Sequence, residues 1–235
     1  MNAVRQNVVR RLVSNAVDSL RRPLLRRRLG RLVVEEVAGV PLVVLPDVFN
    51  PRIFRTGEML AETIAALPWE AASVPRVLDL GTGSGVGSIF AALRGWSVVA
   101  VDINPEAVRC CRVNALMHGL EEQVEVHLGD LFAPVAGERF DLVLFNPPYF
   151  RGDPSSPLDA AWRGRNVLER FAAALPKHLN PGGRALLMLS SHGDCDALLE
   201  ALRVRGMANE IAARRDFGNE VLTLYTTSMM TEVPS

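Results

Sequence analysis

An amide side chain stands where an apolar run of strand type ends. The run covers residues 140–145 and is followed by Asn146, Pro147, Pro148 and Tyr149. Because proline cannot donate to a sheet ladder, the strand is predicted to end at Asn146. The Asn146 side-chain carbonyl and the Pro147 backbone carbonyl are two acceptors that can hold both hydrogens of a planar NH2 group. Tyr149 is placed to cover that group, which would be a carboxamide or the exocyclic amine of a base.

The alternative interpretation of these residues is a strand that simply stops at a Pro-Pro turn. The catalytic interpretation gains weight from three further polar stretches, each of which follows a predicted strand. If the strands are parallel, all four stretches lie at one edge of the sheet, which is where open α/β sheets bind ligands.

The first of these stretches is a glycine-rich turn after residues 77–80. Its glycines would let a ligand approach the backbone closely. Position 86 holds Val where the dinucleotide-binding fingerprint has glycine, so that fingerprint is not matched. Asp79 suits a ligand with a positive ammonium group and is unfavourable for a pyrophosphate. The candidate ligand-binding residues of the turn are Gly81, Thr82, Gly83 and Gly85.

Two more acids follow strands. Asp102 ends a run at residues 97–102, about 20 residues after the glycines, where acids commonly bind ribose hydroxyls. Asp130 comes just after a run at residues 123–128 and is placed to accept a hydrogen bond from an adenine amine, with Leu131 and Phe132 packing on the ring. An aspartate at such a position is also a frequent turn former or helix cap.

The spacing of apolar residues predicts an α/β fold with alternating strands and helices. We expect a doubly wound, Rossmann-like, seven-stranded sheet with an antiparallel C-terminal hairpin, preceded by a small helical and hairpin extension. Thr56 is a plausible cap for a helix starting at residue 58, and that helix N-terminus could hold a carboxylate. Helices are expected at 2–31 (one or two), 58–67, 86–93, 105–118, 165–178 and 194–205, hairpins at 32–45 and 211–226, and a further strand at 185–190.

Bulk properties favour a cytoplasmic protein with an ordinary core. The chain has 235 residues, 49% of them apolar, but no run that approaches a membrane span and no signal-peptide pattern. Three cysteines form no disulfide framework, and four scattered histidines show no metal-ligand spacing, so no metal is expected. Residues 1–31 hold nine arginines and one acid. This basic arm is interpreted as a solvated amphipathic helix, or as a contact for an anionic partner such as RNA.

Taken together, the glycine turn, the acids at 102 and 130, and the Asn-Pro-Pro-Tyr sequence resemble class I methyltransferases that use S-adenosylmethionine. The last motif is similar to that of enzymes that methylate planar nitrogens, and the HemK/PrmC type is the nearest likeness. Three further segments also resemble that type, at residues 48–56, 160–171 and 218–222. The whole resemblance covers about residues 46–227. The chain departs from the family pattern at residues 162–167, where the family usually carries more glycines. The predicted domains are an extension at 1–45 and a methyltransferase domain at 46–235.

The resemblance implies a cofactor, S-adenosylmethionine, and its product, S-adenosylhomocysteine. The methionine end would lie over the glycines, the ribose would meet Asp102 and Ile103, and the adenine would meet Asp130 and Leu131. Thr56 would contact the carboxylate. The implied acceptor is a glutamine side-chain amide of a protein, as in release factors. The alternatives are an adenine N6 or guanine N2 amine of RNA or DNA bound through the basic arm, a small molecule, or a partner subunit that binds the cofactor without catalysis.

Overall fold

The structure is a computed structural model that describes residues 30–53, 55–69, 73–148 and 166–230. The basic arm and Tyr149 lie outside these residues. The strands are β1 (Val33–Val37), β2 (Val40–Val44), β3 (Arg76–Leu80), β4 (Ser97–Asp102), β5 (Val124–Leu128), β6 (Phe140–Phe145), β7 (Leu179–Ser190), β8 (Met207–Asp216) and β9 (Val221–Met229). The helices are α2 (Thr56–Ala66), α3 (Val86–Ala92), α4 (Pro105–Met117), the short 3-10 turn η1 (Ala133–Val135), α5 (Val167–His178) and α6 (Cys195–Arg203).

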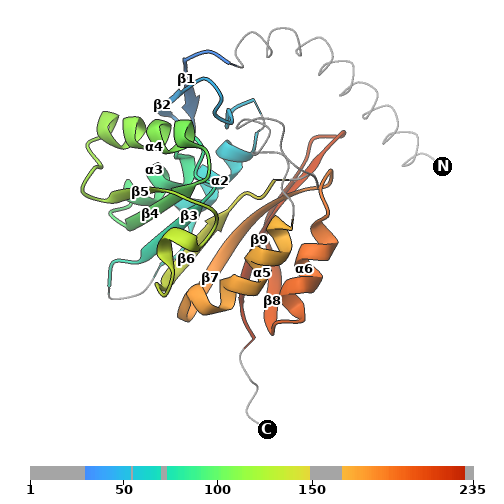
Figure 1. Cartoon of the computed structure of the whole chain (residues 1–235). Helices are drawn as coiled ribbons and strands as arrows, with labels where there is room; N and C mark the ends of the chain where they lie inside the picture. Colours follow the sequence, from blue (N-terminus) through green and yellow to red (C-terminus); the bar gives the residue numbers. More distant parts are fainter. Residues whose placement is uncertain (1–29, 54, 70–72, 149–165, 231–235) are drawn as a thin grey trace, which may run out of the picture.

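Seven strands form one sheet in the order β5-β4-β3-β6-β7-β9-β8 (Figure 1). The pairs from β5 to β7 are parallel, whereas β9 runs antiparallel to both β7 and β8. The chain leaves β3 toward β4 and β5 and later returns on its other side to β6 and β7. The carboxyl ends of β3 and β6 therefore flank the point where the strand order reverses, and a crevice forms at such a point.

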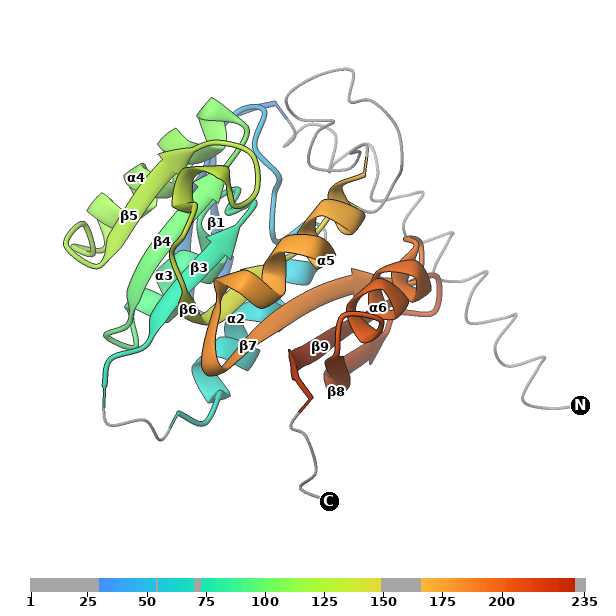
Figure 2. The same cartoon turned by 60° about the horizontal axis from the view of Figure 1, so that its bottom comes forward.

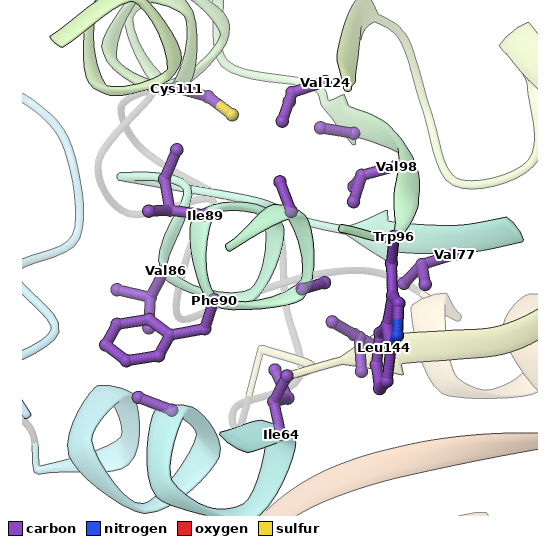
Figure 3. Packing of buried hydrophobic residues seen from close by; sticks show 14 of the residues in the cluster. Ile64, Val77, Val86, Ile89, Phe90, Trp96, Val98, Cys111, Val124 and Leu144 are labelled. Atoms are coloured by element: carbon purple, nitrogen blue, oxygen red, sulfur yellow. The ribbon is translucent and has the colours of Figure 1, made fainter. Parts of the chain in front are cut away.

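Helices cover both faces of the sheet, which explains the nearly continuous apolar character of its central strands. Figure 2 shows α5 and α6 on one face, with α2 and α3 behind the sheet. Alternate residues of one strand enter opposite cores: Val77 packs with α2 and α3, and Leu78 packs with α5 and α6. The first of these cores contains Ile64, Ile89 and Trp96 (Figure 3). Packing on both faces holds the carboxyl ends of the strands rigidly.

The hairpin β1–β2 is bonded to the sheet domain through a fully buried amide. The Asn114 side chain accepts from the Val43 amide at 2.8 Å and donates to the Val43 and Ser84 carbonyls at 2.7 and 2.8 Å. Ser84 belongs to the glycine turn, so one side chain of α4 joins the hairpin to that turn. A domain boundary at residue 45 stays a prediction.

The predicted succession of strands and helices is confirmed for the described residues, with three corrections. The strand expected at 185–190 is β7, which starts six residues earlier, at Leu179. Thr56 does not cap α2: it is the first helical residue, and the cap position belongs to Arg55, whose φ of 61° is left-handed and whose side chain makes no capping bond. The C-terminal hairpin is longer than expected, because β8 starts at Met207, four residues before the predicted hairpin, and β9 runs to Met229, three residues beyond it. Among the described helices, none is long and apolar enough to cross a membrane.

Replacing Asn114 with alanine should destabilise the protein, because the substitution leaves the Val43 amide and the Ser84 carbonyl without this partner and the Val43 carbonyl with only the Cys110 thiol as a donor. Each buried polar group left unsatisfied costs about 1–3 kcal/mol, so a loss of about 3 kcal/mol in the free energy of unfolding is expected in urea titrations. Leu116→Ala on the same helix is the control, since Leu116 is 64% exposed. Equal stability of the two variants would contradict this role of Asn114.

Candidate functional site

A cavity of about 370 Å³ opens at the carboxyl ends of β3, β4 and β6. That volume is in the range of small-molecule sites. Twelve of the predicted site residues line it: Thr56, Asp79, Gly81, Thr82, Gly83, Asp102, Ile103, Asp130, Leu131, Asn146, Pro147 and Pro148. Gly85 is not among the lining residues, and Tyr149 lies outside the described part of the chain.

Asp79 lies beneath the glycine turn and organises it. Its Oδ2 accepts from the Thr82 hydroxyl at 2.7 Å, from the Ser88 amide at 2.9 Å and from the Ser88 hydroxyl at 2.7 Å. Burial raises the pKa of Asp79 to about 6, against the lowering effect of these bonds. The three donors therefore compensate only part of the cost of burying the charge. The predicted contact of Asp79 with an ammonium group would add the missing countercharge.

Gly85 has a structural explanation. It takes a left-handed φ of 84° at the N-terminus of α3, a conformation that glycine adopts without steric cost. A Cβ at this position would stand 3.0 Å from the sulfur of Cys111 on α4. The glycine thus permits both the turn and the close packing of α3 on α4, and its predicted contact with the cofactor stays a prediction.

Asp102 ends β4 beside the glycine turn. Its Oδ2 accepts from the Gly83 amide at 2.8 Å and its Oδ1 from the Asn104 amide at 2.9 Å. Burial raises the pKa of Asp102, and the backbone donors oppose that rise. The carboxylate is held in one orientation at the cavity wall, while Ile103 next to it is 58% exposed and also lines the cavity. A fixed carboxylate with remaining acceptor capacity suits ligand hydroxyls.

Asp130 is paired, which the sequence did not predict. Both of its carboxylate oxygens accept from the guanidinium of Arg170, at 2.6 and 2.8 Å, and Arg170 itself lines the cavity. Leu131 lines the cavity with a φ of 49°, an unfavourable left-handed conformation for leucine. The prediction that Phe132 packs on the adenine ring is wrong: Phe132 does not line the cavity but is buried and stacks on Phe171 and His178.

A further wall comes from the loop between β2 and α2. Asp47, Phe49 and Pro51 line the cavity, and none of them was a predicted site residue. The loop is pinned by Asn50, which is buried, donates to Glu35 of β1 at 3.0 Å and accepts from two amides of its own loop. Hydrogen bonds between one side chain and nearby groups of a loop leave no periodic pattern in the sequence, so periodicity did not point to these three lining residues.

Asn146 and Pro147, the two residues predicted to hold a planar nitrogen, lie at the cavity. Leu80 at the end of β3 pairs in register with Phe145 at the end of β6, so the next residues of both strands lie side by side. Asn146 is half-buried and Pro147 is buried, and both line the cavity together with the three acids. No group of three metal-binding side chains occurs among the residues that the structure describes. The cavity therefore combines a wall that carries three carboxylates with the carbonyl groups of Asn146 and Pro147.

Comparison with known proteins decides the family. Residues 40–217 match the model of the Methyltransferase small domain. The chain belongs to this family. It is an S-adenosylmethionine-dependent methyltransferase.

Two relatives of known name are similar in sequence to this methyltransferase. A putative protein N5-glutamine methyltransferase of Methanocaldococcus jannaschii is 32% identical over 193 residues, which cover 77% of this chain and 92% of the relative. A ribosomal protein uL3 glutamine methyltransferase of Bradyrhizobium diazoefficiens is 36% identical over 165 residues, which cover 62% of this chain. The match spans about half, 51%, of that second relative.

Two solved structures share the fold of the methyltransferase. The Mtq2–Trm112 complex of E. cuniculi, described as responsible for methylation of the eRF1 termination factor, matches with a TM-score of 0.57 and 26% identity over 78% of this chain and 99% of that chain. The 16S rRNA N2 G1207 methyltransferase of T. thermophilus, solved with AdoMet and guanosine, matches with a TM-score of 0.63 and 20% identity over 85% of this chain and 50% of the other. The second match shows the fold alone.

The lining residues fit the cofactor chemically. S-adenosylmethionine carries an ammonium group, a sulfonium, two ribose hydroxyls and an adenine amine. The cavity offers three carboxylates, a glycine turn that allows close approach, and apolar walls at Ile103 and Leu131. We predict that Asp79 and the glycine turn hold the methionine end, Asp102 the ribose and Asp130 with Leu131 the adenine.

Substituting Asp79 with asparagine should stabilise the protein and weaken the binding of the cofactor. The folded-state pKa of about 6 lies above the ordinary value of 3.8 for an aspartate, so the wild type loses stability as the pH rises from about 4 through 6. Asparagine keeps an acceptor for the three donors without that cost. We expect the variant to gain about 1–2 kcal/mol over wild type at pH 7.5, and no gain at pH 4, in urea titrations. S-adenosylhomocysteine should bind at least about tenfold more weakly.

Asp102→Ala should weaken S-adenosylhomocysteine binding by at least about thirtyfold, because the substitution removes the ribose acceptor and releases the Gly83 and Asn104 amides. Isothermal titration calorimetry measures the dissociation constant. Glu125→Ala on neighbouring β5 is a matched control, since Glu125 is exposed and outside the cavity. An unaltered dissociation constant in Asp102→Ala would remove this residue from the site.

Proposed function

We propose that this methyltransferase transfers a methyl group to the side-chain amide nitrogen of a glutamine in a protein. The observation that carries the proposal is the position of Asn146 and Pro147. Both line the same cavity as Asp79, Asp102 and Asp130, at adjacent strand ends. The names of the two relatives, glutamine methyltransferases of proteins, support the same acceptor.

An amide nitrogen is a poor nucleophile because its lone pair is delocalised into the carbonyl. The NH2 group would donate hydrogen bonds to the carbonyl groups of Asn146 and Pro147. These bonds push electron density toward the nitrogen and aim its lone pair at the methyl group. S-adenosylmethionine, when bound, supplies an electrophilic methyl group. Two preorganised acceptors contribute about 2–4 kcal/mol each in comparable sites. The amide proton becomes acidic once the nitrogen has gained its new bond, so a strong base is not required.

The two prolines make this arrangement rigid. Pro147 restricts the backbone of Asn146 to an extended conformation, and neither proline has an amide hydrogen that would compete for the carbonyls. Asn146 follows Phe145, which is buried and stacks on Phe171 of α5 with ring centroids 4.3 Å apart. The acceptors therefore stand on a strand end that the core fixes, which preorganised catalysis needs.

The acceptor class can be tested with labelled S-adenosylmethionine and three pools: a release-factor protein, total RNA and duplex DNA, with mass spectrometry to locate the methyl group. Label on a glutamine amide is the expected result. Label on adenine or guanine amines would contradict the proposal and would assign the arginines of residues 1–31 to phosphate contacts. Cofactor binding without label in any pool would also contradict it and would point to a small-molecule acceptor or a non-catalytic subunit.

Asn146→Ala should reduce turnover at least about a hundredfold, because it removes one of the two acceptors that align the nitrogen. The dissociation constant for S-adenosylhomocysteine should change by less than about threefold, since the carboxylates that hold the cofactor remain. Single-turnover kinetics and calorimetry measure the two quantities. Turnover that equals wild type would end the proposed mechanism.

A further inference from the structure

Arg170 is a charged residue at the cavity whose role neither the sequence motifs nor the proposed reaction explains. It lies in the first turns of α5, where its amide donates to the Asn166 carbonyl at 3.0 Å. Its two terminal nitrogens donate separately to the two oxygens of Asp130, at 2.6 and 2.8 Å. The contact is two-pronged, so it fixes both the position and the rotation of the carboxylate.

The ion pair contributes little to the fold itself. The side chains of Arg170 and Asp130 are 48% and 42% exposed, and pairs in that environment are worth little because water screens them. Asp130 raises the pKa of Arg170, so the guanidinium stays charged. A ligand that fills the cavity displaces water from this rim, and the same pair then interacts in a lower dielectric. Its effect therefore belongs to the ligand-bound state.

The geometry leaves capacity on the carboxylate for a ligand. An ionised carboxylate accepts at about four lone-pair positions, and the guanidinium takes one on each oxygen. The remaining positions can accept from an amino group but repel a carbonyl oxygen. Leu131, in its left-handed conformation, and Val167 of α5 line the cavity next to the pair. This part of the cavity wall thus places two apolar side chains, Leu131 and Val167, beside the oriented carboxylate of Asp130.

We propose that Arg170 is a positioning residue that fixes Asp130 as the acceptor for the adenine amino group and so makes the cavity selective for an amino-bearing base over an oxo-bearing one. The inference rests on the cofactor and on the predicted adenine contact of Asp130. It does not depend on which molecule accepts the methyl group. The substrate glutamine and the reacting methyl are not contacted by Arg170 in this scheme.

The test compares two ligands that differ only at the N1–C6 edge of the base: S-adenosylhomocysteine and S-inosylhomocysteine, in which a carbonyl oxygen replaces the amino group and N1 carries a hydrogen. Calorimetry gives both dissociation constants for the full chain. Wild type should prefer the adenosyl ligand by at least about tenfold. In Arg170→Gln the adenosyl ligand should bind about tenfold more weakly and the inosyl ligand within about twofold of wild type, so the preference collapses.

Arg203→Gln is the matched control. Arg203 also makes a two-pronged contact with a carboxylate, through Nε and one terminal nitrogen to Glu200 of the same helix α6, at 2.8 and 2.8 Å and outside the cavity. The two variants should have the same thermal midpoint without ligand, and only Arg170→Gln should change ligand preference. In the double variant Arg170→Gln with Asp130→Asn, the loss of preference should equal that of Asp130→Asn alone, because Arg170 acts through Asp130.

Equal weakening of both ligands in Arg170→Gln would overturn the inference, because a merely structural role moves both constants together. An unchanged preference would overturn it as well. So would a wild type that binds the two ligands equally, since Asp130 would then not accept from the amine. A collapse of preference in an enzyme that methylates no glutamine would leave this inference standing and reject only the proposed acceptor.

Discussion

The site depends on one buried carboxylate. Asp79 stands near the carboxyl end of β3, and three hydrogen bonds from Thr82 and Ser88 converge on one of its oxygens. A buried charge is unfavourable unless it is fully compensated, so the turn must fold around it to supply the donors. The raised pKa of Asp79, about 6, shows that this compensation is incomplete. Gly87 is part of the same arrangement, because a Cβ there would stand 2.9 Å from Oδ1 of Asp79.

This constraint extends from the turn to the rest of the cavity. With the turn fixed, the Gly83 amide reaches Asp102 of β4, and the Ser84 carbonyl reaches Asn114 of α4. The parallel register of β3 with β6 then brings Asn146 next to the turn. The residues predicted to bind the cofactor and the methyl acceptor are thus placed by neighbouring strand ends, which suits a reaction that relies on alignment.

The sequence predicted the parts of this structure that follow from local chemistry. Apolar runs identified the strands because both faces of the sheet are buried, and the polar residues that end those runs identified Asp102 and Asn146. The pairing of Asp130 with Arg170 could not be predicted, because the residues are 40 positions apart and meet only through the packing of α5 on the sheet. Thr56 was misplaced as a cap because a left-handed Arg55 begins the helix, a choice set by the loop before it.

The most direct test of the central claim is a crystal structure of the protein with S-adenosylhomocysteine and a glutamine-containing peptide. We predict that the glutamine amide lies in the cavity with its two hydrogens directed at the side-chain oxygen of Asn146 and the carbonyl oxygen of Pro147. A peptide whose glutamine lies elsewhere, or an amide whose hydrogens are held by other residues, would contradict the claim that these two acceptors direct the methyl transfer.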